Sequence, residues 1–482
     1  MNTNRIRVRF APSPTGLMHL GNVRTALLNY LFARQKNGVF VLRIEDTDPT
    51  RNFDPGAKKI ISDLNWLNLE YDEGPIKEGP YKPYFQSERL SCYQEMLKKL
   101  QEQDLVYRCF CTSDELEQKR QQQIALKLPP RYDRTCLNLS EDEIKANLAQ
   151  KKPFIWRMKI DPNESITIHD LARGPITFDL QHFSDFPLTR QDGSFTFIFA
   201  NAVDDALMKI NHIFRGEDHL SNTANQAVLY KALGFLLPTF WHLPILCNIE
   251  GKKLSKRDFG FSLQDLNNAG FLPEALVNYL AIIGGGTFEH EIMTLDELKN
   301  ALNFDDIHST GHVRYDVEKL RWVNHKWIDQ YPPEKLTQAA RPFLEQAYPE
   351  AKQISDEKLT HLLQTVKTDL TTLLDAQECL AFYFKTPPIT KELLLKHISK
   401  DDQTKIGSII SNNLDKINNT DLFVEAIKQQ AKQHNVPLKT IFSAIRLALT
   451  GAAKGPSIHD LFEILEPEKI SKRLENLITL LP

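Results

Sequence analysis

Residues 5–46 carry the pattern of a strand, a loop, a helix and a second strand, and this pattern restricts the fold strongly. Charged and apolar residues alternate in "RIRVRF" at 5–10, which predicts a strand, and "GVFVLRIED" at 38–46 predicts another. Between them, apolar side chains recur at helical spacing: Val23, Ala26, Leu27, Tyr30 and Leu31. A strand–helix–strand unit implies a parallel sheet, and such sheets bind ligands at the carboxyl ends of strands and beside helix N-termini.

The bulk properties limit the class of protein. With 482 residues the chain is too long for one core, so we expect roughly two to four domains. A net charge of −3 gives no overall basic signal, so a nucleic-acid partner would need local basic patches. No apolar stretch reaches the ~18 residues of a membrane span, and no secretion signal is evident. Six unevenly placed cysteines then favour a cytoplasmic protein.

The character of the sequence changes twice along the chain. Residues 101–190 combine a helix rich in Gln and Glu, clustered cysteines and short strands, which predicts an inserted α+β domain. Strand-like runs return in "SFTFIFANAVDD" at 194–205 and "MKINHIFRGEDH" at 208–219. From residue 326 on, only three of the twenty glycines remain and apolar residues follow helical spacing. We therefore expect an all-helical C-terminal domain.

Two basic strings are nearly identical: "KLSKR" at 253–257 and "KISKR" at 469–473. The first lies in a predicted loop after a strand-like run, from which lysines can swing toward a triphosphate. The second follows Pro467, which suits the first turn of a helix. That helix carries an apolar stripe: Ile470, Leu474, Leu477, Ile478 and Leu481. The first string is predicted to act in chemistry, and the cations of the second to be solvated: Lys469, Lys472 and Arg473.

Five motifs, taken in order, resemble one family. They are "RFAPSPTGLMHLGN" at 9–22, "RIEDTD" at 43–48, "YDEGP" at 71–75, "RGEDH" at 215–219 and "KLSKR" at 253–257. Together they resemble the class I aminoacyl-tRNA synthetases, and in detail the bacterial glutamyl-tRNA synthetases. The resemblance covers the N-terminal two-thirds of the chain. The remaining third agrees in helical character and in "GPSIHDLFEIL" near the end.

The resemblance implies an α/β fold: a Rossmann-type parallel-sheet catalytic domain, split by an inserted α+β domain and followed by an all-α domain. The expected catalytic domain comprises residues 1–100 and 191–250. The insertion at 101–190 would bind the tRNA acceptor end, and residues 251–325 would carry the lysine loop and a stem contact. Residues 326–482 would bind the anticodon.

The resemblance also implies the residues that handle ATP. His19, Lys253 and Lys256 are the implied catalytic residues, because an imidazole and two ammonium groups can stabilise charge on reacting phosphates. Further implied ATP contacts are Pro12, Gly16, Gly21, Asn22, Asp218 and Ser255. Mg²⁺ is expected to accompany ATP by bridging its phosphates. An ordinary Pro/Gly turn with a helix-capping role is the alternative for the loop taken alone.

The amino-acid pocket needs cations for two carboxylates and an anion for the amine. Arg9, Glu45 and Arg215 supply that set from three strand ends, and arginine forks suit carboxylates. A structural salt-bridge network is the alternative. The resemblance implies that Arg9 and Arg215 bind the carboxylates of glutamate, and it adds further contacts: Ser13, Asn201 and Phe197. The family usually has tyrosine where Phe197 stands, so a phenol hydrogen bond is lacking, which could weaken glutamate binding.

Grouped cysteines suggest a metal. Cys109, Cys111, Tyr132 and Cys136 match the spacing of a knuckle that binds zinc in some bacterial glutamyl enzymes, which implies one Zn²⁺ per chain. Asn138 stands where that knuckle sometimes has a histidine. The alternative is small buried cysteines without metal.

The implied function is ATP-dependent attachment of L-glutamate to tRNA(Glu) through glutamyl-adenylate, by an enzyme that we expect to be a monomer. The alternatives are a glutaminyl-tRNA synthetase, whose group carries C-terminal β-barrels, and a catalytically silent tRNA-binding paralogue. An ungapped comparison places Asp369 where strict glutamate enzymes tend to carry an arginine near the third anticodon base. A shift of two residues would bring Lys367 there instead. Asp369 therefore leads to the hypothesis of relaxed discrimination, with some charging of tRNA(Gln).

Overall fold

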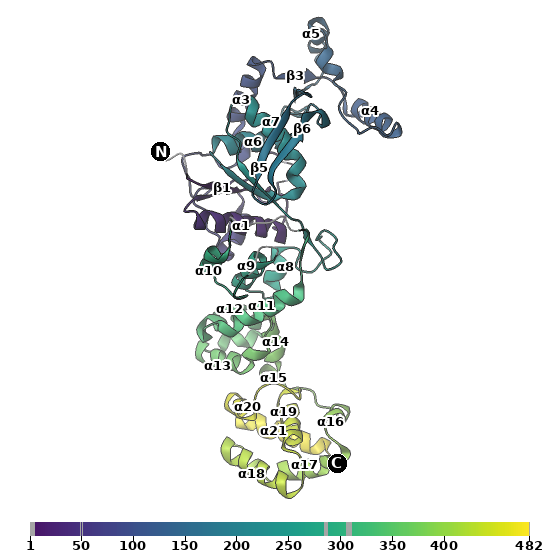
Figure 1. Ribbon diagram of the computed structural model, residues 1–482. Coiled ribbons are helices and arrows are strands. Elements are labelled where there is room, and N and C mark those ends of the chain that lie inside the picture. Colours follow the sequence, from purple (N-terminus) through teal and green to yellow (C-terminus); the bar gives the residue numbers. More distant parts are fainter. Residues whose placement is uncertain (1–4, 49, 51, 284–287, 305–310, 482) are drawn as a thin grey trace. The chain divides into compact units, whose positions relative to one another are not determined.

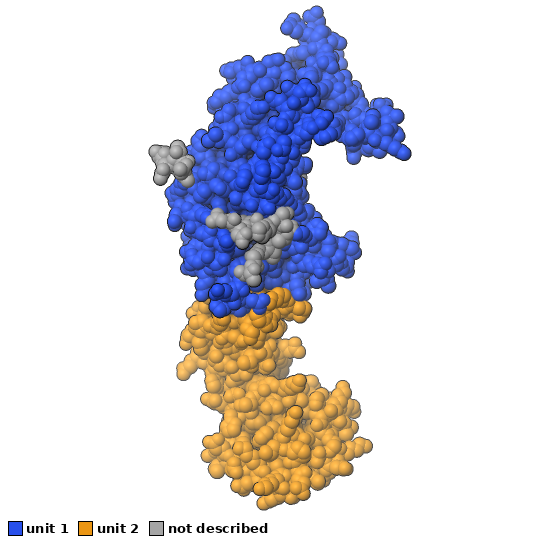
Figure 2. All heavy atoms as spheres, in the orientation of Figure 1, with its two compact units in different colours: residues 1–265, 277–317 blue, residues 266–276, 318–482 orange. Residues whose placement is uncertain are grey.

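The computed structural model describes residues 5–48, 50, 52–283, 288–304 and 311–481. The chain divides into two compact units (Figure 2). Unit 1 comprises residues 1–265 and 277–317, and unit 2 comprises residues 266–276 and 318–482. The division into five parts that we expect from the sequence stays a prediction.

The strand–helix–strand unit forms as predicted (Figure 1). Strand β1 (Arg7–Phe10) pairs in parallel with β2 (Val39–Leu42), and α1 (Leu20–Gln35) connects them. All four residues of β2 are buried, and α1 packs on the strands through side chains such as Val23 and Leu27. The carboxyl end of β1 therefore leads directly into the loop that precedes α1.

A second group of strands lies in unit 1. Strands β7 (His212–Gly216) and β8 (Thr239–Leu243) are parallel, β5 (Ser165–Asp170) is parallel to β8, and β6 (Gly174–Asp179) is antiparallel to β5. The N–H of Asn211 donates to the carbonyl oxygen of Arg7 at 3.1 Å, which places β1 beside β7. The predicted strand at 208–219 is thus confirmed as β7.

The predicted strand at 194–205 is wrong, because these residues form helix α6 (Phe197–Leu207). This helix is buried on most of its sides: Phe199, Ala200, Ala202, Val203 and Ala206 belong to the core. Even its acidic residues lie inside, where Asp205 accepts a hydrogen bond from Arg43. A helix that is buried on most sides has apolar residues on all of its faces. Its sequence then lacks the 3.6-residue period by which a helix is distinguished from a buried strand.

The range predicted as an insertion, 101–190, contains β5 and β6 and also two antiparallel strands that pair with each other, β3 (Val106–Cys109) and β4 (Ile155–Met158). Helices α4 (Ser113–Ala125) and α5 (Glu141–Ala149) bury no residue, and each begins with a reciprocal cap. Thr112 and Glu115 cap α4, and Ser140 and Glu143 cap α5. Hydrogen bonds at their first turns therefore stabilise α4 and α5, which have no buried side chains to stabilise them by packing.

The other elements of unit 1 connect these parts. They are α2 (Lys58–Trp66), η2 (Gln86–Glu88), α3 (Leu90–Glu102), η3 (Thr135–Asn138), η4 (Leu180–His182), η5 (Glu217–His219), α7 (Leu220–Ala232), β9 (Leu246–Cys247), α10 (Leu295–Ala301) and β10 (Val313–Arg314). Helices α8 (Leu263–Asn268) and α9 (Pro273–Ile282) have residues in both units, and the first residue of α11 (Val317–Gln330) belongs to unit 1.

The described residues of unit 2 from Glu318 on form helices and loops without a strand, which confirms the all-helical prediction. The helices are α11 (Val317–Gln330), α12 (Pro333–Ala347), η6 (Pro349–Gln353), α13 (Asp356–Val366), η7 (Lys367–Asp369), η8 (Leu373–Asp375), α14 (Ala376–Cys379), α15 (Ala381–Phe384), α16 (Lys391–His397), α17 (Lys400–Ser411), η9 (Leu414–Lys416), α18 (Thr420–Gln433), α19 (Leu438–Thr450), α20 (Ile458–Ile464) and α21 (Pro467–Leu480). Within the described part of the chain, no helix has the length and apolar character needed to cross a membrane.

The second basic string lies on α21, which begins at Pro467 as predicted. Lys472 is exposed, but the prediction that Arg473 is solvated is wrong, since its side chain is only 5% exposed. Its guanidinium donates to the carbonyl oxygens of Leu449 at 2.6 Å and Phe382 at 2.8 Å. Both carbonyls lie near helix C-termini, where backbone acceptors lack partners within the helix. The long arginine side chain reaches these acceptors from the edge of the apolar stripe.

Candidate active site

One cavity of about 970 Å³ in unit 1 brings the predicted site residues together. It lies at the ends of β1, β2 and β7 and beside the start of α1, where parallel sheets bind ligands. The predicted residues that line it are Arg9, Pro12, Ser13, Gly16, His19, Gly21, Asn22, Glu45, Phe197, Asn201, Arg215, Asp218, Lys253 and Lys256. Ser255 does not line it, because its hydroxyl and N–H both donate to Asp258, each at 2.9 Å.

His19 is the N-cap of α1 and is held in one tautomer. Its Nδ1 accepts a hydrogen bond from the N–H of Asn22 at 3.3 Å, and its ring stacks on Phe261. Burial and then the charge of Lys253 lower the pKa of His19, so the ring is neutral at neutral pH. Because Nδ1 accepts, the proton of the neutral ring lies on Nε2 and can be donated to a ligand oxygen.

The lysine loop is anchored by its backbone, and its two lysine side chains are exposed. The N–H of Leu254 donates to the carbonyl oxygen of Leu246 at 2.9 Å, and Leu254 itself is buried. Lys253 approaches Asp218 at 3.3 Å, but both side chains are about half exposed or more, so this ion pair is weak. Lys256 is exposed and makes no hydrogen bond or ion pair with the described residues. The loop therefore presents two exposed cations at the cavity.

Buried charges surround the inner end of the cavity. Asp205 accepts from Arg9 Nε at 3.1 Å and from Arg43 Nη1 at 2.6 Å. Arg43 also donates to Glu45 at 3.0 Å, and the amide of Asn201 donates to the same carboxylate at 2.5 Å. Burial would raise the pKa of Asp205, but Arg43 and Arg9 outweigh it and lower that pKa. Sequence motifs pointed to Arg9, Glu45 and Asn201. They missed Asp205, which holds Arg9, and Arg43, which holds Glu45.

Arg215 has two buried donor nitrogens that are not used within the described part of the chain. Its side chain is 6% exposed, and one nitrogen, Nη2, donates to Thr223 Oγ1 at 2.6 Å. Nε and Nη1 are buried without a hydrogen-bond partner among the described residues. Burial, and then the charge of Arg9, lower the pKa of Arg215 to about 10, so the group stays cationic at neutral pH. A buried cation with unpaired donors is suited to an anionic ligand, since unpaired buried donors are costly.

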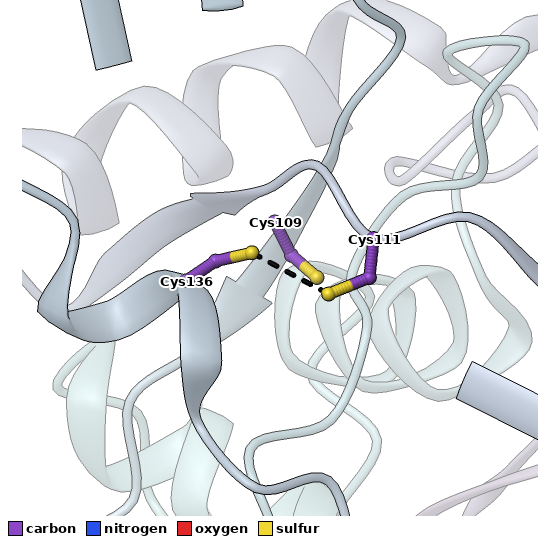
Figure 3. A group of neighbouring side chains, drawn as sticks. All are labelled: Cys109, Cys111 and Cys136. Atoms are coloured by element: carbon purple, nitrogen blue, oxygen red, sulfur yellow. Dashed lines mark hydrogen bonds between the residues drawn. The ribbon is translucent and has the colours of Figure 1, made fainter. Parts of the chain in front are cut away.

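The predicted metal ligands also meet. The sulfurs of Cys109, Cys111 and Cys136 point toward one another and lie within 4.8 Å of each other (Figure 3). The Cys111 and Cys136 sulfurs are 3.5 Å apart, and the Tyr132 hydroxyl lies 3.3 Å from the Cys109 sulfur. Tetrahedral zinc with Zn–S bonds of ~2.3 Å places its sulfurs ~3.8 Å apart. The Arg157 guanidinium lies 3.9 Å above the Tyr132 ring. This donor set fits zinc in number, type and spacing.

Comparison with known proteins gives a consistent assignment. Residues 5–322 match the catalytic domain of tRNA synthetases class I (E and Q), and residues 335–478 match an anticodon binding domain. The chain is 39% identical over 478 residues to a glutamate–tRNA ligase of Sulfurihydrogenibium sp., which covers 98% of this chain and 99% of that protein. It is 35% identical over 482 residues to the glutamate–tRNA ligase of Bacillus pumilus, covering 98% of this chain and 100% of that protein.

The chain belongs to the class I tRNA synthetases.

A solved structure supports the same assignment. The crystal structure of a glutamate tRNA ligase from Elizabethkingia meningosepticum, in complex with its amino acid, matches this synthetase with a TM-score of 0.86 and 32% sequence identity. The match covers 99% of this chain and 100% of that chain. The α/β fold class, with a Rossmann-like parallel-sheet domain and a helical C-terminal domain, is thus confirmed.

Asp369 lies in the helical unit of the synthetase, at the end of η7, and its side chain is exposed. The alternative position, Lys367, is partly buried, and its ammonium donates to the carbonyl oxygen of Tyr331 at 2.9 Å. An exposed aspartate can accept a hydrogen bond from a base but cannot donate one.

Proposed function

We propose that this synthetase attaches L-glutamate to tRNA with ATP as the energy source. One observation carries the proposal: a single cavity contains two buried arginines and Glu45 for an acidic amino acid, together with His19 and two lysines for a triphosphate. The relatives named above are glutamate ligases over their full lengths. The helical character of unit 2 also argues against the glutaminyl alternative, which is expected to carry β-barrels there.

Glutamate binds through its three charged groups. Arg215 offers two unpaired donors to one carboxylate of glutamate. Arg9 binds the other carboxylate of glutamate, and Asp205 holds the guanidinium of Arg9 in place. Glu45 accepts from the ammonium group, and Asn201 orients Glu45. Phe197 contributes a ring without a phenol, so the hydrogen bond that the family's tyrosine would give is absent from this pocket.

Activation follows from the position of the cations. An oxygen of the glutamate α-carboxylate attacks the α-phosphorus of ATP, and the bond to the bridging oxygen breaks, so that pyrophosphate leaves. His19 Nε2–H and Lys253 and Lys256 stabilise the phosphate oxygens as charge shifts to the leaving group. Mg²⁺ bound to ATP would add positive charge on the phosphates to that of His19, Lys253 and Lys256. The chain thus supplies mainly position and charge.

Transfer to tRNA uses the other parts of the chain. A ribose hydroxyl of the terminal adenosine, by class I analogy the 2′-OH, attacks the glutamyl carbonyl carbon, and AMP leaves. We assign acceptor-end binding to the insertion, with one zinc on Cys109, Cys111, Cys136 and Tyr132 as its structural centre.

Unit 2 binds the anticodon. With Asp369 on its surface, we propose that discrimination against tRNA(Gln) is relaxed. Cytoplasmic location and a monomeric state stay predictions.

ATP–pyrophosphate exchange in the presence of tRNA tests the function. Exchange should require glutamate and should not be supported by glutamine at the same concentration. Exchange that depends on glutamine would favour a glutaminyl-tRNA synthetase. If neither amino acid supports exchange while tRNA still binds, the protein is a silent paralogue and the proposal fails.

A further inference from the structure

Arg215 is the last member of a chain of buried hydrogen bonds that reaches a carboxylate on another strand. Its Nη2 donates to Thr223 Oγ1 at 2.6 Å, and that oxygen lies 2.8 Å from His242 Nε2. His242 Nδ1 lies 2.7 Å from Asp170 Oδ2. Asp170 and Thr223 are fully buried, and His242 is 1% exposed. Four elements meet in this chain, namely β7, α7, β8 and β5.

The hydrogen bonds have a defined direction. Burial lowers the pKa of His242 although Asp170 opposes this, so the ring is neutral at neutral pH. Burial would raise the pKa of Asp170, but its hydrogen bonds with His242 outweigh this and lower it. The ionised carboxylate must accept, so Nδ1 carries the ring proton and Nε2 is left as an acceptor. The Thr223 hydroxyl proton then faces two acceptors, Nε2 at 2.8 Å and the carbonyl oxygen of His219 at 3.1 Å, and the shorter contact is to Nε2. The hydroxyl oxygen accepts from Arg215.

The groups around the histidine support this arrangement. The N–H of His242 donates to the same carboxylate oxygen at 3.0 Å, and its ring stacks on Phe240 at 5.6 Å. Arg173 donates to the carbonyl oxygen of His242 at 3.1 Å, and its charge is paired with Glu217. The ring therefore has little freedom to rotate, and its Nε2 stays aimed at Thr223.

The arrangement keeps Arg215 fixed without neutralising it. Arg9 and Arg43 each contact the carboxylate of Asp205 directly. Arg215 instead meets a neutral hydroxyl, and the charge of Asp170 lies beyond Thr223 and His242. A carboxylate in direct contact would compete with the substrate's carboxylate for the guanidinium. A neutral acceptor holds one nitrogen and leaves the charge and the other donors for a ligand.

We propose that Asp170, His242 and Thr223 form a positioning relay that orients Arg215 for a carboxylate of the amino-acid substrate. The inference rests on the proposed function, because it takes the acidic amino acid as the ligand of Arg215. None of these three residues lines the cavity, whereas Arg215 does, so they would act on substrate affinity through Arg215.

The test is the Thr223→Val variant, which keeps the side-chain shape and removes the hydroxyl. KM for glutamate should rise roughly tenfold to a hundredfold, because a charge-assisted hydrogen bond that orients the guanidinium is lost. KM for ATP should stay within about threefold of the wild-type value, since Thr223 does not line the cavity and its hydroxyl contacts none of the residues assigned to ATP. Thr223→Ser restores a hydroxyl and should return KM for glutamate to within about threefold.

Two further variants separate positioning from folding. Thr337→Val is a matched control in unit 2, where another buried threonine loses two hydroxyl hydrogen bonds. It should leave KM for glutamate unchanged. If Thr223→Val does not fold, His242→Asn serves instead, because its amide can still reach Asp170 but is too short to reach Thr223.

The results also distinguish this inference from the proposed function. If wild-type protein shows no glutamate-dependent exchange, the proposed function fails. If the wild-type protein is active and Thr223→Val leaves KM for glutamate within twofold, the relay is overturned while the function stands. An equal rise in KM for glutamate and for ATP would indicate a general structural defect and would likewise overturn the relay.

Discussion

The ring of His19 occupies space that a side chain at position 21 would need. A Cβ on Gly21 would lie 3.1 Å from His19 Nδ1 and Cε1, closer than ordinary van der Waals contact. Gly21 is thus required for the position of the histidine that caps α1 and faces the cavity.

Gly21→Ala should lower the rate of pyrophosphate exchange by roughly tenfold or more, because the His19 ring must shift by tenths of an ångström. The free energy of unfolding should not fall, since alanine is a better helix residue than glycine. The control is Gly407→Ala in α17, where a Cβ would lie 3.6 Å from Leu481, an ordinary contact. It should leave exchange unchanged. Full activity of Gly21→Ala would show that the ring has room to move without consequence.

The two basic strings should respond differently to the same substitution. Lys256→Ala should lower adenylate formation by roughly 10²–10³, the usual effect of removing one donor to a transition state. Lys472→Ala should change it by less than about threefold, as a mild surface substitution does. Single-turnover assays on both variants make the comparison, and similar losses in the two would refute the assignment of chemistry to the first string.

Arg473, next to Lys472, should matter for stability instead of catalysis. Arg473→Ala removes the donors to the buried carbonyls of Leu449 and Phe382 and should lower the free energy of unfolding by about 2–3 kcal/mol. Lys472→Ala should change it by less than about 0.5 kcal/mol. Urea denaturation measures both, and equal stabilities would contradict the buried role of Arg473.

Purified protein should carry about one zinc per chain, since three sulfurs and a phenol converge at the spacing of a tetrahedral site. Cys109→Ser should release the metal and reduce tRNA charging more than ATP binding, because the insertion is assigned to the acceptor end. Cys92→Ser lies outside the cluster and should retain zinc. Elemental analysis that finds no zinc in protein prepared without chelators would remove this claim.

The enzyme should charge tRNA(Gln) with glutamate at a measurable rate, because Asp369 cannot donate to a base edge and Lys367 is engaged with Tyr331. Asp369→Arg should increase the preference for tRNA(Glu). Charging assays on both purified tRNAs decide the point. A wild-type preference for tRNA(Glu) above about 10³, or ~4 kcal/mol, rules the hypothesis out.

Local patterns in the sequence predicted β1, α1 and the all-helical tail correctly. In β1 and α1 the pattern is carried by residue type and not by a single buried side, because β1 buries Val8, Arg9 and Phe10 in succession and α1 also buries Arg24 and Asn29. The pattern failed for α6, which is buried on most sides. The helical spacing also failed for Arg473, which was predicted to be solvated because it lies off the apolar stripe. Its long side chain bends to reach a buried carbonyl oxygen, and helical spacing does not predict such a contact.

Much of the cavity was predicted from motifs, but its support was not. Arg9, Glu45 and Arg215 lie in or directly after strands, and a parallel sheet brings such ends together. His242 and Asp170 are separated by 72 residues and meet because β5 and β8 are neighbours in the sheet. Neither segment of the sequence alone indicates that His242 and Asp170 are hydrogen-bonded. This contact can be predicted only when the pairing of β5 with β8 is known.

Aminoacylation with labelled amino acids tests the central claim most directly. Wild-type protein, ATP, Mg²⁺ and tRNA(Glu) are incubated with glutamate or with glutamine, and the amino acid bound to acid-precipitated tRNA is counted. We predict that glutamate is attached with a kcat/KM at least about 10³ above that for glutamine, a difference of ~4 kcal/mol. Equal values, or a preference for glutamine, would contradict the assignment of the cavity to an acidic amino acid.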